Sequence, residues 1–383
     1  MGIDRKIRVL FLVLEMDLGG LQRIVNLLIQ KIDKEKFEPY LVCLDRGGMF
    51  FDQAASSCAG SHILSRKPGL FDRSLFRRLY GIVRDNRIDI IHSHNGCSSY
   101  AALAGRLAGV KRVIHTDHGR LVPDRRGAIM EDWLASHFLD RFVGVSAELT
   151  EYLRTKVRIG ESKIRTIVNG VDDQMFRLRS AEDRMAIRSE LGFRDADQII
   201  GTVCRLDPIK NVGFMISCMP EILRRAPSSI LAVVGDGPSR EELSLQARQS
   251  GVESKVIFLG PRRDPENVMP AFDVYACSSI SEGTSMTILE AMSCGLPVLA
   301  SAVGGNPRLV NDSIGILFDL NDRPAFINAA AAVLADQDSR LAMGARSRLR
   351  VEREFSLTEM TNKYHMMYLG KDQQPWRTAE SST

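Results

Sequence analysis

The chain has 383 residues and a mass of 42.7 kDa, enough for about two domains at roughly 150 residues each. Apolar residues make up 44% of it and charged residues 26%, which is typical of a folded globular protein and excludes a disordered or fibrous one. No stretch approaches the roughly 18 uncharged apolar residues of a membrane-spanning helix. Seven scattered cysteines without a C-x-x-C pair favour reduced thiols in a cytoplasmic protein over a disulfide framework or a zinc ribbon.

The net charge of +4 is unevenly distributed along the chain. Residues 1–180 contain 29 Lys and Arg against 21 Asp and Glu, a net charge of +8, whereas residues 181–383 contain 22 against 26, a net charge of −4. The basic first half predicts an anionic partner, such as phosphates, a lipid headgroup surface or nucleic acid. Its arginines are scattered and no pattern of stacking aromatics accompanies them, so we expect no nucleic-acid partner.

Both halves of the chain alternate short β-rich runs with segments of helical period. The expected strands are 8–14, 40–44, 88–92, 112–116, 142–145 and 165–168 in the first half, and 199–204, 230–234, 256–259, 274–277, 297–301 and 315–318 in the second. Continuous apolar strands separated by helices predict parallel sheets covered on both faces, and hence two doubly wound, Rossmann-like α/β domains. We expect the first domain at 1–180, the second at 181–354, a join within 177–197 and a disordered tail at 371–383.

The first expected strand runs directly into a turn with paired glycines, Gly19 and Gly20, and a helix follows. Glycines at such a turn let a ligand approach the backbone and point free N–H groups at an anion. A plain tight turn with close helix packing is the alternative interpretation.

In the second half, Arg205 and Lys210 follow the carboxyl end of the first expected strand. Ligands of doubly wound sheets bind beyond these strand ends, and two cations placed there can neutralise a diphosphate. Solvated surface cations are the alternative.

The most informative stretch is 281–297, in which a helical pattern begins near Ser285 and ends at Gly295. The first helical residues offer unpaired N–H groups to a phosphate, and they are Ser285, Met286 and Thr287. Glu282 precedes the helix and Glu290 lies about a turn inside it, so both can face one ligand. The alternative is an acidic helix start that offsets the macrodipole, with Glu290 in solvent.

Histidines gather at two expected strand ends, His92 and His94 at one, His115 and His118 at the other. No Cys or paired carboxylate at ligand spacing completes a metal site, so we expect no metal. Each of these histidines has two possible interpretations: a catalytic residue, or a residue at the rim of the core whose hydrogen bonds are satisfied within the protein.

Taken in order, these stretches resemble glycosyltransferase family 4, the retaining nucleotide-sugar transferases of GT-B fold, over nearly the whole chain. The resemblance rests on Gly19-Gly20, the turn 116–119, 145–146, V-N-G-V-D at 168–172, Arg205 with Lys210, V-G-D-G-P at 234–238, F-L-G at 258–260, Glu282-x7-Glu290, G-L-P-V at 295–298 and V-G-G-N-P at 303–307. Within the family, the pieces at 118–120, 287–292 and 304–307 resemble most the bacterial sugar transferases of exopolysaccharide clusters. One position departs from that subgroup, since Arg308 stands where its pattern has a Glu.

The resemblance implies two domains facing a central cleft, with a final helix at 355–369 crossing back to the first domain. It implies catalytic roles for Glu282, His118, Arg205 and Lys210. It also implies a set of donor-binding residues, which comprises Gly20, Arg205, Lys210, Glu282, Ser285, Met286, Thr287 and Glu290. Arg205 and Lys210 would hold the diphosphate, Glu290 the ribose and Glu282 the donor sugar, which His118 would reach from the first domain.

The implied substrates are a UDP- or GDP-sugar donor, with no separate cofactor and no metal, and a glycan or lipid-linked acceptor of exopolysaccharide or lipopolysaccharide synthesis. Three alternatives belong to other classes. A glycoside hydrolase would leave the cation pair unexplained; a nucleotide-sugar 2-epimerase shares the architecture; and a non-catalytic sugar-nucleotide-binding module would have no use for the full set of charged residues.

Residues 73–84 have helical period, with apolar residues near one face and arginines around its edge. Such a helix can lie in the headgroup region of an anionic membrane, which would make this cytoplasmic protein peripheral on the inner face of the cell membrane. The alternative is a helix that covers the sheet and buries its apolar face in the core.

Overall fold

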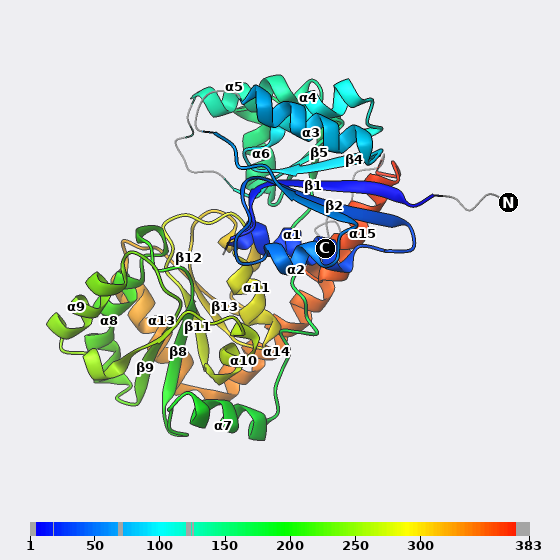
Figure 1. The fold of residues 1–383 in the computed structure, drawn as a ribbon. Coiled ribbons are helices and arrows are strands. Elements are labelled where there is room, and N and C mark those ends of the chain that lie inside the picture. Colours follow the sequence, from blue (N-terminus) through cyan, green and yellow to red (C-terminus); the bar gives the residue numbers. More distant parts are fainter. Residues whose placement is uncertain (1–4, 18, 68–71, 120–123, 125, 373–383) are drawn as a thin grey trace. The chain divides into compact units, whose positions relative to one another are not determined.

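The computed structural model describes residues 5–17, 19–67, 72–119, 124 and 126–372. They divide into two compact units, the first within Met1–Asn169 and Thr358–Thr383 and the second spanning Gly170–Leu357. Each unit is built on a parallel sheet with helices on both faces (Figure 1). These are the two Rossmann-like domains that the alternating pattern predicts.

The first unit contains a seven-stranded sheet of order β3-β2-β1-β4-β5-β6-β7 in the described part of the chain. Its strands are β1 (Ile7–Glu15), β2 (Phe37–Arg46), β3 (Gly60–Ile63), β4 (Ile90–His94), β5 (Arg112–Asp117), β6 (Arg141–Gly144) and β7 (Ile164–Thr166). Its helices are α1 (Gly20–Lys31), α2 (Phe51–Ala55), α3 (Arg73–Asp85), α4 (Ser98–Ala108), α5 (Arg126–Ser136), α6 (Ala147–Thr155) and α15 (Leu357–Tyr368), with the 3-10 turn η1 (Glu161–Lys163).

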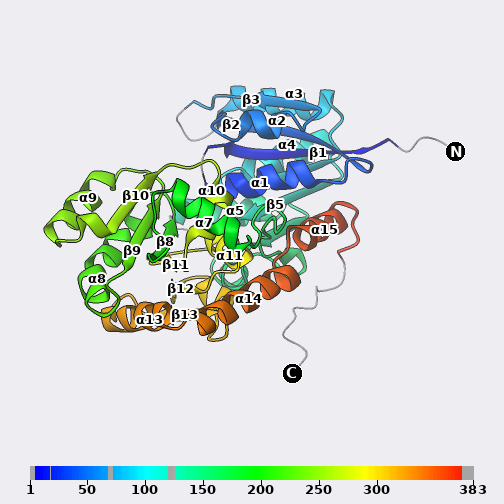
Figure 2. The ribbon, with the colours of Figure 1, turned by 90° about the horizontal axis from the view of Figure 1, so that it is seen from below.

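The second unit contains a six-stranded sheet of order β10-β9-β8-β11-β12-β13. Its strands are β8 (Gln198–Val203), β9 (Ser229–Val234), β10 (Val256–Gly260), β11 (Val274–Cys277), β12 (Val298–Ser301) and β13 (Gly315–Phe318). Its helices are α7 (Ala181–Glu190), α8 (Val212–Arg225), α9 (Arg240–Gln249), α10 (Pro265–Val268), α11 (Met286–Ser293), α12 (Asn306–Leu309), α13 (Arg323–Ala335) and α14 (Gln337–Glu354), with 3-10 turns η2 (Pro208–Lys210), η3 (Glu253–Lys255) and η4 (Met269–Ala271). Helices α8, α9 and α13 share one core, as Figure 2 shows on one side of the sheet, and α11 packs on α14.

The central strand β1 shows why the first sheet has two distinct faces. Side chains alternate along a strand, so Leu10 and Leu12 enter the core beneath α3 and α4. Phe11 points to the opposite face, where its ring lies 5.6 Å from that of His92. The same alternation along β4 places His92 on the face of Phe11 and Ile91 in the core of Leu10.

Every expected strand overlaps a strand of the structure, and the sequence pattern missed one, β3. This strand has the sequence G-S-H-I and lies at the sheet edge, paired only with β2. An edge strand needs no apolar run because one of its sides faces solvent, which explains why periodicity did not indicate it.

The division between the units falls between Asn169 and Gly170, ahead of the join expected within 177–197. Residues 170–180 pack with the second unit because Val171 N–H donates to the carbonyl of Phe355 at 2.9 Å. In addition, the Arg348 guanidinium donates to the carbonyl of Phe176 at 2.8 Å.

The chain leaves the second unit through α15, whose residues from Thr358 onward belong to the first unit. This is the return that the resemblance implies for the final helix. The disorder expected from residue 371 does not include Asp372, which is 2% exposed and accepts a hydrogen bond from Arg141. Residues 373–383 lie outside the described part of the chain.

Helix α3 covers the first sheet. Its residues Leu75, Leu79 and Val83 are at most 1% exposed and belong to the core shared with β1 and α4. The apolar face that suggested insertion into a membrane is therefore occupied by the protein core, whereas the arginines Arg77 and Arg78 are exposed. None of the helices in the described residues is long and apolar enough to cross a membrane.

A buried carboxylate ties α7 to the second sheet. Asp273 is 5% exposed, and it accepts hydrogen bonds from Arg184 at 2.8 Å, Arg188 at 2.7 Å and the backbone N–H of Ile199 at 2.7 Å. Removing one partner of such a cluster leaves buried charge without compensation, which is far more damaging than losing a surface ion pair. The charged stretch that looked like a linker is thus part of the second unit.

We expect the Asp273→Ala variant to lower the free energy of unfolding by about 3–5 kcal/mol, because both arginines lose their buried counter-charge. Urea unfolding followed by circular dichroism measures it. Glu253→Ala is the matched control, since it removes an ion pair with Arg248 in which both side chains are 63% exposed. Equal stability of the two variants would contradict the role assigned to the cluster.

Candidate active site

Lys210 and Glu282, two of the residues expected to be catalytic, form an ion pair in the second unit. Lys210 Nζ donates to Glu282 Oε1 at 2.7 Å, and the Ser279 hydroxyl donates to the same oxygen at 2.6 Å. Burial opposes the charge of Lys210, but the adjacent Glu282 carboxylate more than offsets it and raises the pKa of Lys210. The lysine therefore keeps its positive charge at neutral pH.

This pair lies where doubly wound sheets bind ligands. Lys210 follows β8 and Glu282 follows β11, and these strands are neighbours in the sheet. Strand order runs outward from them in opposite directions, which makes the gap between their carboxyl ends the topological switch point. A backbone hydrogen bond also joins the two loops: Ile280 N–H donates to the carbonyl of Ile209 at 2.8 Å.

Arg205, the other expected diphosphate ligand, comes from the same loop but lies in a different environment. Its side chain is 68% exposed, and its Nε is 3.8 Å from a carboxylate oxygen of Asp207. Lys210 is thus held by a carboxylate, whereas Arg205 extends into solvent. A guanidinium with this freedom can turn toward an anion at little cost in lost contacts.

Helix α11 begins where the sequence pattern places it, with Ser285 as its N-cap and Met286 as its first residue. The hydroxyl of the buried Tyr275 donates to Thr287 Oγ1 at 2.7 Å, which fixes the first turn against β11. The first N–H groups of a helix have no partner within the helix. Glu290 is 1% exposed, so it does not lie in solvent as the alternative interpretation had it.

Two glycines of the recognised motifs permit close contact between the loops at this edge. Gly235 has a φ of +132°, and a Cβ there would lie 1.8 Å from the carbonyl oxygen of Cys204. Gly304 has a φ of +51°, and a Cβ there would lie 1.8 Å from the carbonyl oxygen of Glu282. Side chains at either position would therefore displace the backbone that carries Arg205 or Glu282.

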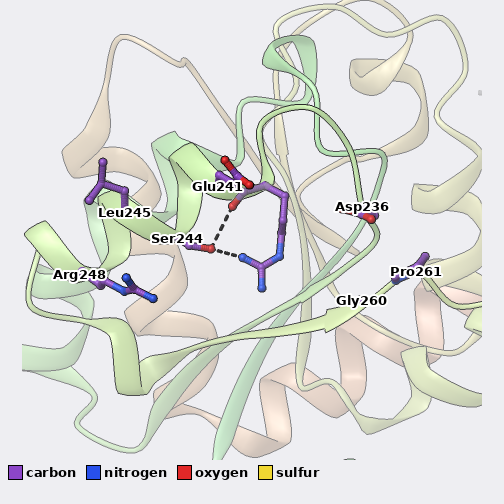
Figure 3. A pocket seen from close by; sticks show the side chains of 8 residues that line it. Asp236, Glu241, Ser244, Leu245, Arg248, Gly260 and Pro261 are labelled. Atoms are coloured by element: carbon purple, nitrogen blue, oxygen red, sulfur yellow. Dashed lines mark hydrogen bonds between the residues drawn. The ribbon is translucent and has the colours of Figure 1, made fainter.

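A cavity of about 470 Å³ lies at the carboxyl ends of β9 and β10 (Figure 3). It is lined by Asp236, Arg240, Glu241, Ser244, Leu245, Arg248, Gly260 and Pro261. None of the expected site residues lines it. Leu206 N–H donates to the carbonyl of Asp236 at 2.9 Å, so the cavity adjoins the loop of Arg205.

Four histidines of the first unit, His92, His94, His115 and His118, lie on β4 and β5 or directly after β5. His94 Nδ1 and His118 Nε2 are 2.9 Å apart and share a hydrogen bond. The backbone N–H of His118 donates to Asn95 Oδ1 at 2.7 Å, and Asn95 Nδ2 donates to the carbonyl of Gly119 at 2.9 Å. The turn that carries His118 is thus fixed from the neighbouring strand.

The hydrogen bond between His94 and His118 couples the tautomers of the two rings. Burial lowers the pKa of His118 to about 3 and that of His94 well below its usual range, so both rings are neutral at pH 7. His94 Nε2 and His118 Nδ1 are buried without a hydrogen-bond partner. The bridge holds one proton, on either His94 Nδ1 or His118 Nε2. In the first case His118 carries its proton on Nδ1, and in the second case Nδ1 is an acceptor.

We call His92, His94 and His118 the histidine layer. Two tyrosines of α15 contact this layer or the threonine bonded to it. His92 Nδ1 is 2.7 Å from the Tyr368 hydroxyl, and its Nε2 is 2.8 Å from Thr116 Oγ1. Tyr364 is 3.2 Å from the same Thr116 oxygen. The rings of His92 and His94 lie 4.4 Å apart. The final helix therefore contacts the layer that holds His118.

The remaining expected residues are placed as follows. Gly20 is exposed and begins α1 at the carboxyl end of β1. Arg308 is exposed on α12, and its carbonyl accepts a hydrogen bond from Arg350 at 2.7 Å. Arg120, part of the recognised turn, lies outside the described residues. Of the expected set, Gly20 and His118 belong to the first unit and all others to the second.

Sequence reasoning did not assign a site role to Ser279, Tyr275, His94 or the tyrosines of α15. Ser279 and Tyr275 lie on or directly after a buried strand, where they look like core residues. The partners Tyr364 and Tyr368 are more than 240 residues from Thr116 and His92, beyond any local pattern. Among the described residues no group of three or more His, Cys, Asp and Glu side chains could hold a metal ion.

Comparisons with known proteins agree with this geometry. Residues 18–175 match the family model "Glycosyltransferase Family 4", and residues 183–350 match "Glycosyl transferases group 1". An Escherichia coli protein named UDP-Gal:alpha-D-GlcNAc-diphosphoundecaprenol alpha-1,3-galactosyltransferase is 27% identical over 95% of this chain and 97% of its own. A GDP-mannose-dependent alpha-(1-6)-phosphatidylinositol monomannoside mannosyltransferase of Mycolicibacterium smegmatis is 30% identical over 66% of this chain and 69% of its own. The crystal structure of Anabaena Alr3699/HepE in complex with UDP has a TM-score of 0.84 and 21% identity, covering 95% of this chain and 100% of that one.

The two Rossmann-like units have the GT-B fold, and the family models and the relatives identify the chain as a glycosyltransferase. The chain belongs to glycosyltransferase family 4. The 2-epimerase alternative finds no support among these relatives, whose names are those of glycosyltransferases.

The histidine layer predicts acid sensitivity confined to the first unit. All seven histidines lie in it, because residues 170–357 contain none. Burial keeps His92, His94 and His118 neutral when folded, with their pKa lowered, whereas the unfolded chain binds protons below about pH 6.5. Stability is therefore full above that pH and falls on acidification, by about 1.4 kcal/mol per pH unit for each such histidine.

Hydrogen exchange at pH 7.0 and 5.5, corrected for the intrinsic exchange rate, measures this effect peptide by peptide. We expect protection to fall in peptides of β4 and β5 and to change little in those of β8 and β11, which serve as the internal control. Equal loss in both units would refute the explanation.

Proposed function

We propose that the protein transfers a sugar, with retention of configuration, from a UDP- or GDP-sugar to a glycan or lipid-linked acceptor in exopolysaccharide or lipopolysaccharide synthesis. The observation that carries the proposal is the Lys210–Glu282 pair of 2.7 Å at the switch point, beside the N-terminus of α11. A charged lysine and unpaired helix N–H groups at one place suit a diphosphate.

The names of the relatives support the substrate classes. The Escherichia coli relative is named for a UDP-sugar donor and a diphosphoundecaprenol acceptor, and the Mycolicibacterium smegmatis relative for GDP-mannose and a phosphatidylinositol mannoside. Both nucleotides and two lipid-linked acceptors are thus represented. We propose a cytoplasmic site of action, which the seven free cysteines support, with peripheral contact to the inner face of the membrane.

Each charged residue has a role that follows from its environment. Lys210 and Arg205 would stabilise the negative charge that develops on the departing nucleoside diphosphate. Donor phosphates would compete with Glu282 for Lys210, so donor binding would free the Glu282 carboxylate to accept hydrogen bonds from the sugar. The buried Glu290 would accept hydrogen bonds from the ribose hydroxyls, and Ser285, Met286 and Thr287 would present N–H groups to a phosphate.

In the first unit, Gly20 would let the backbone approach the donor, and His118 would act on the donor sugar. Because Nε2 is engaged with His94, the ring nitrogen of His118 left for the donor sugar is Nδ1, which donates a hydrogen bond to a sugar oxygen in one neutral tautomer and accepts one from a sugar hydroxyl in the other. Its low pKa argues against a role as a proton-donating imidazolium at neutral pH.

We expect Lys210→Ala and Arg205→Ala each to reduce kcat/KM by about 10²–10³-fold, because each removes a positive charge from the leaving diphosphate. Release of nucleoside diphosphate from a panel of UDP- and GDP-sugars, with and without acceptor, is the measurement. Arg353→Ala, an exposed arginine on α14, is the control for loss of a surface cation. Full activity of Lys210→Ala would disprove the assignment of the diphosphate site.

Turnover should not depend on a divalent metal, because the lysine, the arginine and the helix N-terminus supply the positive potential that a metal would otherwise provide. We expect the same rate in buffer with excess EDTA and in buffer with Mg²⁺ or Mn²⁺. An activity that is lost in chelator and restored by either ion would contradict this prediction. A glycoside hydrolase would instead release sugar without nucleoside diphosphate.

A further inference from the structure

The first unit exposes large apolar side chains on two adjacent helices. Leu107 on α4 is 60% exposed, and Leu134 on α5 is 52% exposed. Leu103, four residues before Leu107, and Met130, four residues before Leu134, are also exposed. Residues four apart share one face of a helix, so each helix presents an apolar stripe to the outside. Phe138, in the turn after α5, extends the second stripe.

Two hydrogen bonds show that these stripes lie side by side. The Ser99 hydroxyl donates to Glu131 at 2.5 Å at the start of both helices. Arg106 Nε donates to the carbonyl of Phe138 at 2.8 Å at their end. Both contacts join residues 32 positions apart, so α4 and α5 run parallel and in constant register. The stripes therefore form one band, which we call the α4–α5 apolar band, comprising Leu103, Leu107, Met130, Leu134 and Phe138.

Cations flank this band on the α3 side and at the end where Phe138 lies. Helix α3 packs on α4 and exposes four arginines, Arg73, Arg77, Arg78 and Arg84. Next to Phe138, at one end of the band, lies a cavity of about 470 Å³. It is lined by Arg106, Leu139, Asp140, Arg141, Ser162, Lys163 and Arg165. Residues 66–126 carry thirteen lysines and arginines against five acidic residues, a net charge of +8. This single segment accounts for the basic excess of the first half.

Charge decides which partner fits the band. A second copy of the chain would meet it with the same surface, because a two-fold contact pairs a patch with itself. The arginines of α3 would then approach one another without counter-charge. An anionic lipid surface instead accepts the apolar side chains at the acyl boundary and neutralises the cations around them. An exposed apolar patch with a basic rim therefore favours a lipid surface.

We propose that the α4–α5 apolar band docks the protein on an anionic phospholipid bilayer, with the arginines of α3 and the basic cavity contacting lipid phosphates. Leu107, Leu134 and Phe138 enter the headgroup region, and the cations remain at its surface. The proposal names the membrane partner of the proposed function and rests on it for its purpose, but the docking itself does not require the enzyme to turn over.

This surface differs from the one expected from the sequence. The helical pattern of residues 73–84 suggested that α3 itself inserts, but Leu75, Leu79 and Val83 are buried in the core. Helix α3 contributes charge only. The apolar contribution comes from its neighbours, whose exposed residues had no distinctive pattern in the sequence.

Sedimentation of the full chain with vesicles tests the proposal. We expect the protein to pellet with vesicles of phosphatidylglycerol and phosphatidylcholine, and to remain in the supernatant with phosphatidylcholine alone. The double variant Leu107→Asp with Leu134→Asp should reduce the bound fraction at equal lipid by about tenfold or more, because two apolar contacts become charges that the lipid repels. Arg77→Glu with Arg78→Glu should weaken binding and reduce its dependence on salt.

Leu341→Asp is the matched control, because Leu341 is 62% exposed on α14 of the second unit. It should bind vesicles like the wild type. Release of nucleoside diphosphate without vesicles should be unchanged in all three variants, which separates a failure of docking from a failure of the proposed function. Binding of the Leu107→Asp, Leu134→Asp variant equal to wild type would overturn the proposal. So would sedimentation velocity showing that this variant turns a dimer into a monomer, since a second copy would then occupy the band.

Discussion

The ion pair of Lys210 and Glu282 depends on the parallel order of the second sheet, and the candidate donor site depends on the pair. Parallel strands bring their carboxyl ends to one edge, and the switch between β8 and β11 leaves room there for a ligand. Because both side chains are mostly withdrawn from solvent, at 27% and 11% exposure, each needs the other as counter-charge. The free protein thus keeps a lysine charged in the position where a diphosphate would need it.

Glycines and hydroxyls maintain this geometry. The loops after β8, β9, β11 and β12 approach one another closely at Gly235 and Gly304, where no Cβ fits. The Ser278 hydroxyl donates to the carbonyl of Asn211 at 3.0 Å, and the Ser301 hydroxyl to that of Ser279 at 2.7 Å. A site supported in this way is preorganised, so charge contacts need little rearrangement when a ligand binds.

The first unit holds its candidate residue by a different means. His118 depends on a buried, uncharged layer of rings and hydroxyls, in which a hydrogen bond with His94 Nδ1 orients its ring. Burial keeps that layer neutral, and α15 supports it through Tyr364 and Tyr368. The second unit therefore concentrates charge at its site, whereas the first holds a neutral histidine at its own and carries exposed arginines on α3.

The sequence by itself determined the two parallel sheets, because apolar runs of strand length separated by helical periods have few other solutions. It also located the start of α11 at Ser285 and the charged residues around it, since capping and strand ends leave local signals. The edge strand β3, the boundary at Asn169 and the burial of Asp372 carried no such signal. Only tertiary structure paired Lys210 with Glu282, His94 with His118 and His92 with Tyr368, because those contacts join residues 72, 24 and 276 positions apart. It also decided which apolar face is core and which is exposed, since α3, α4 and α5 all carry apolar residues and burial depends on the neighbours each helix packs against.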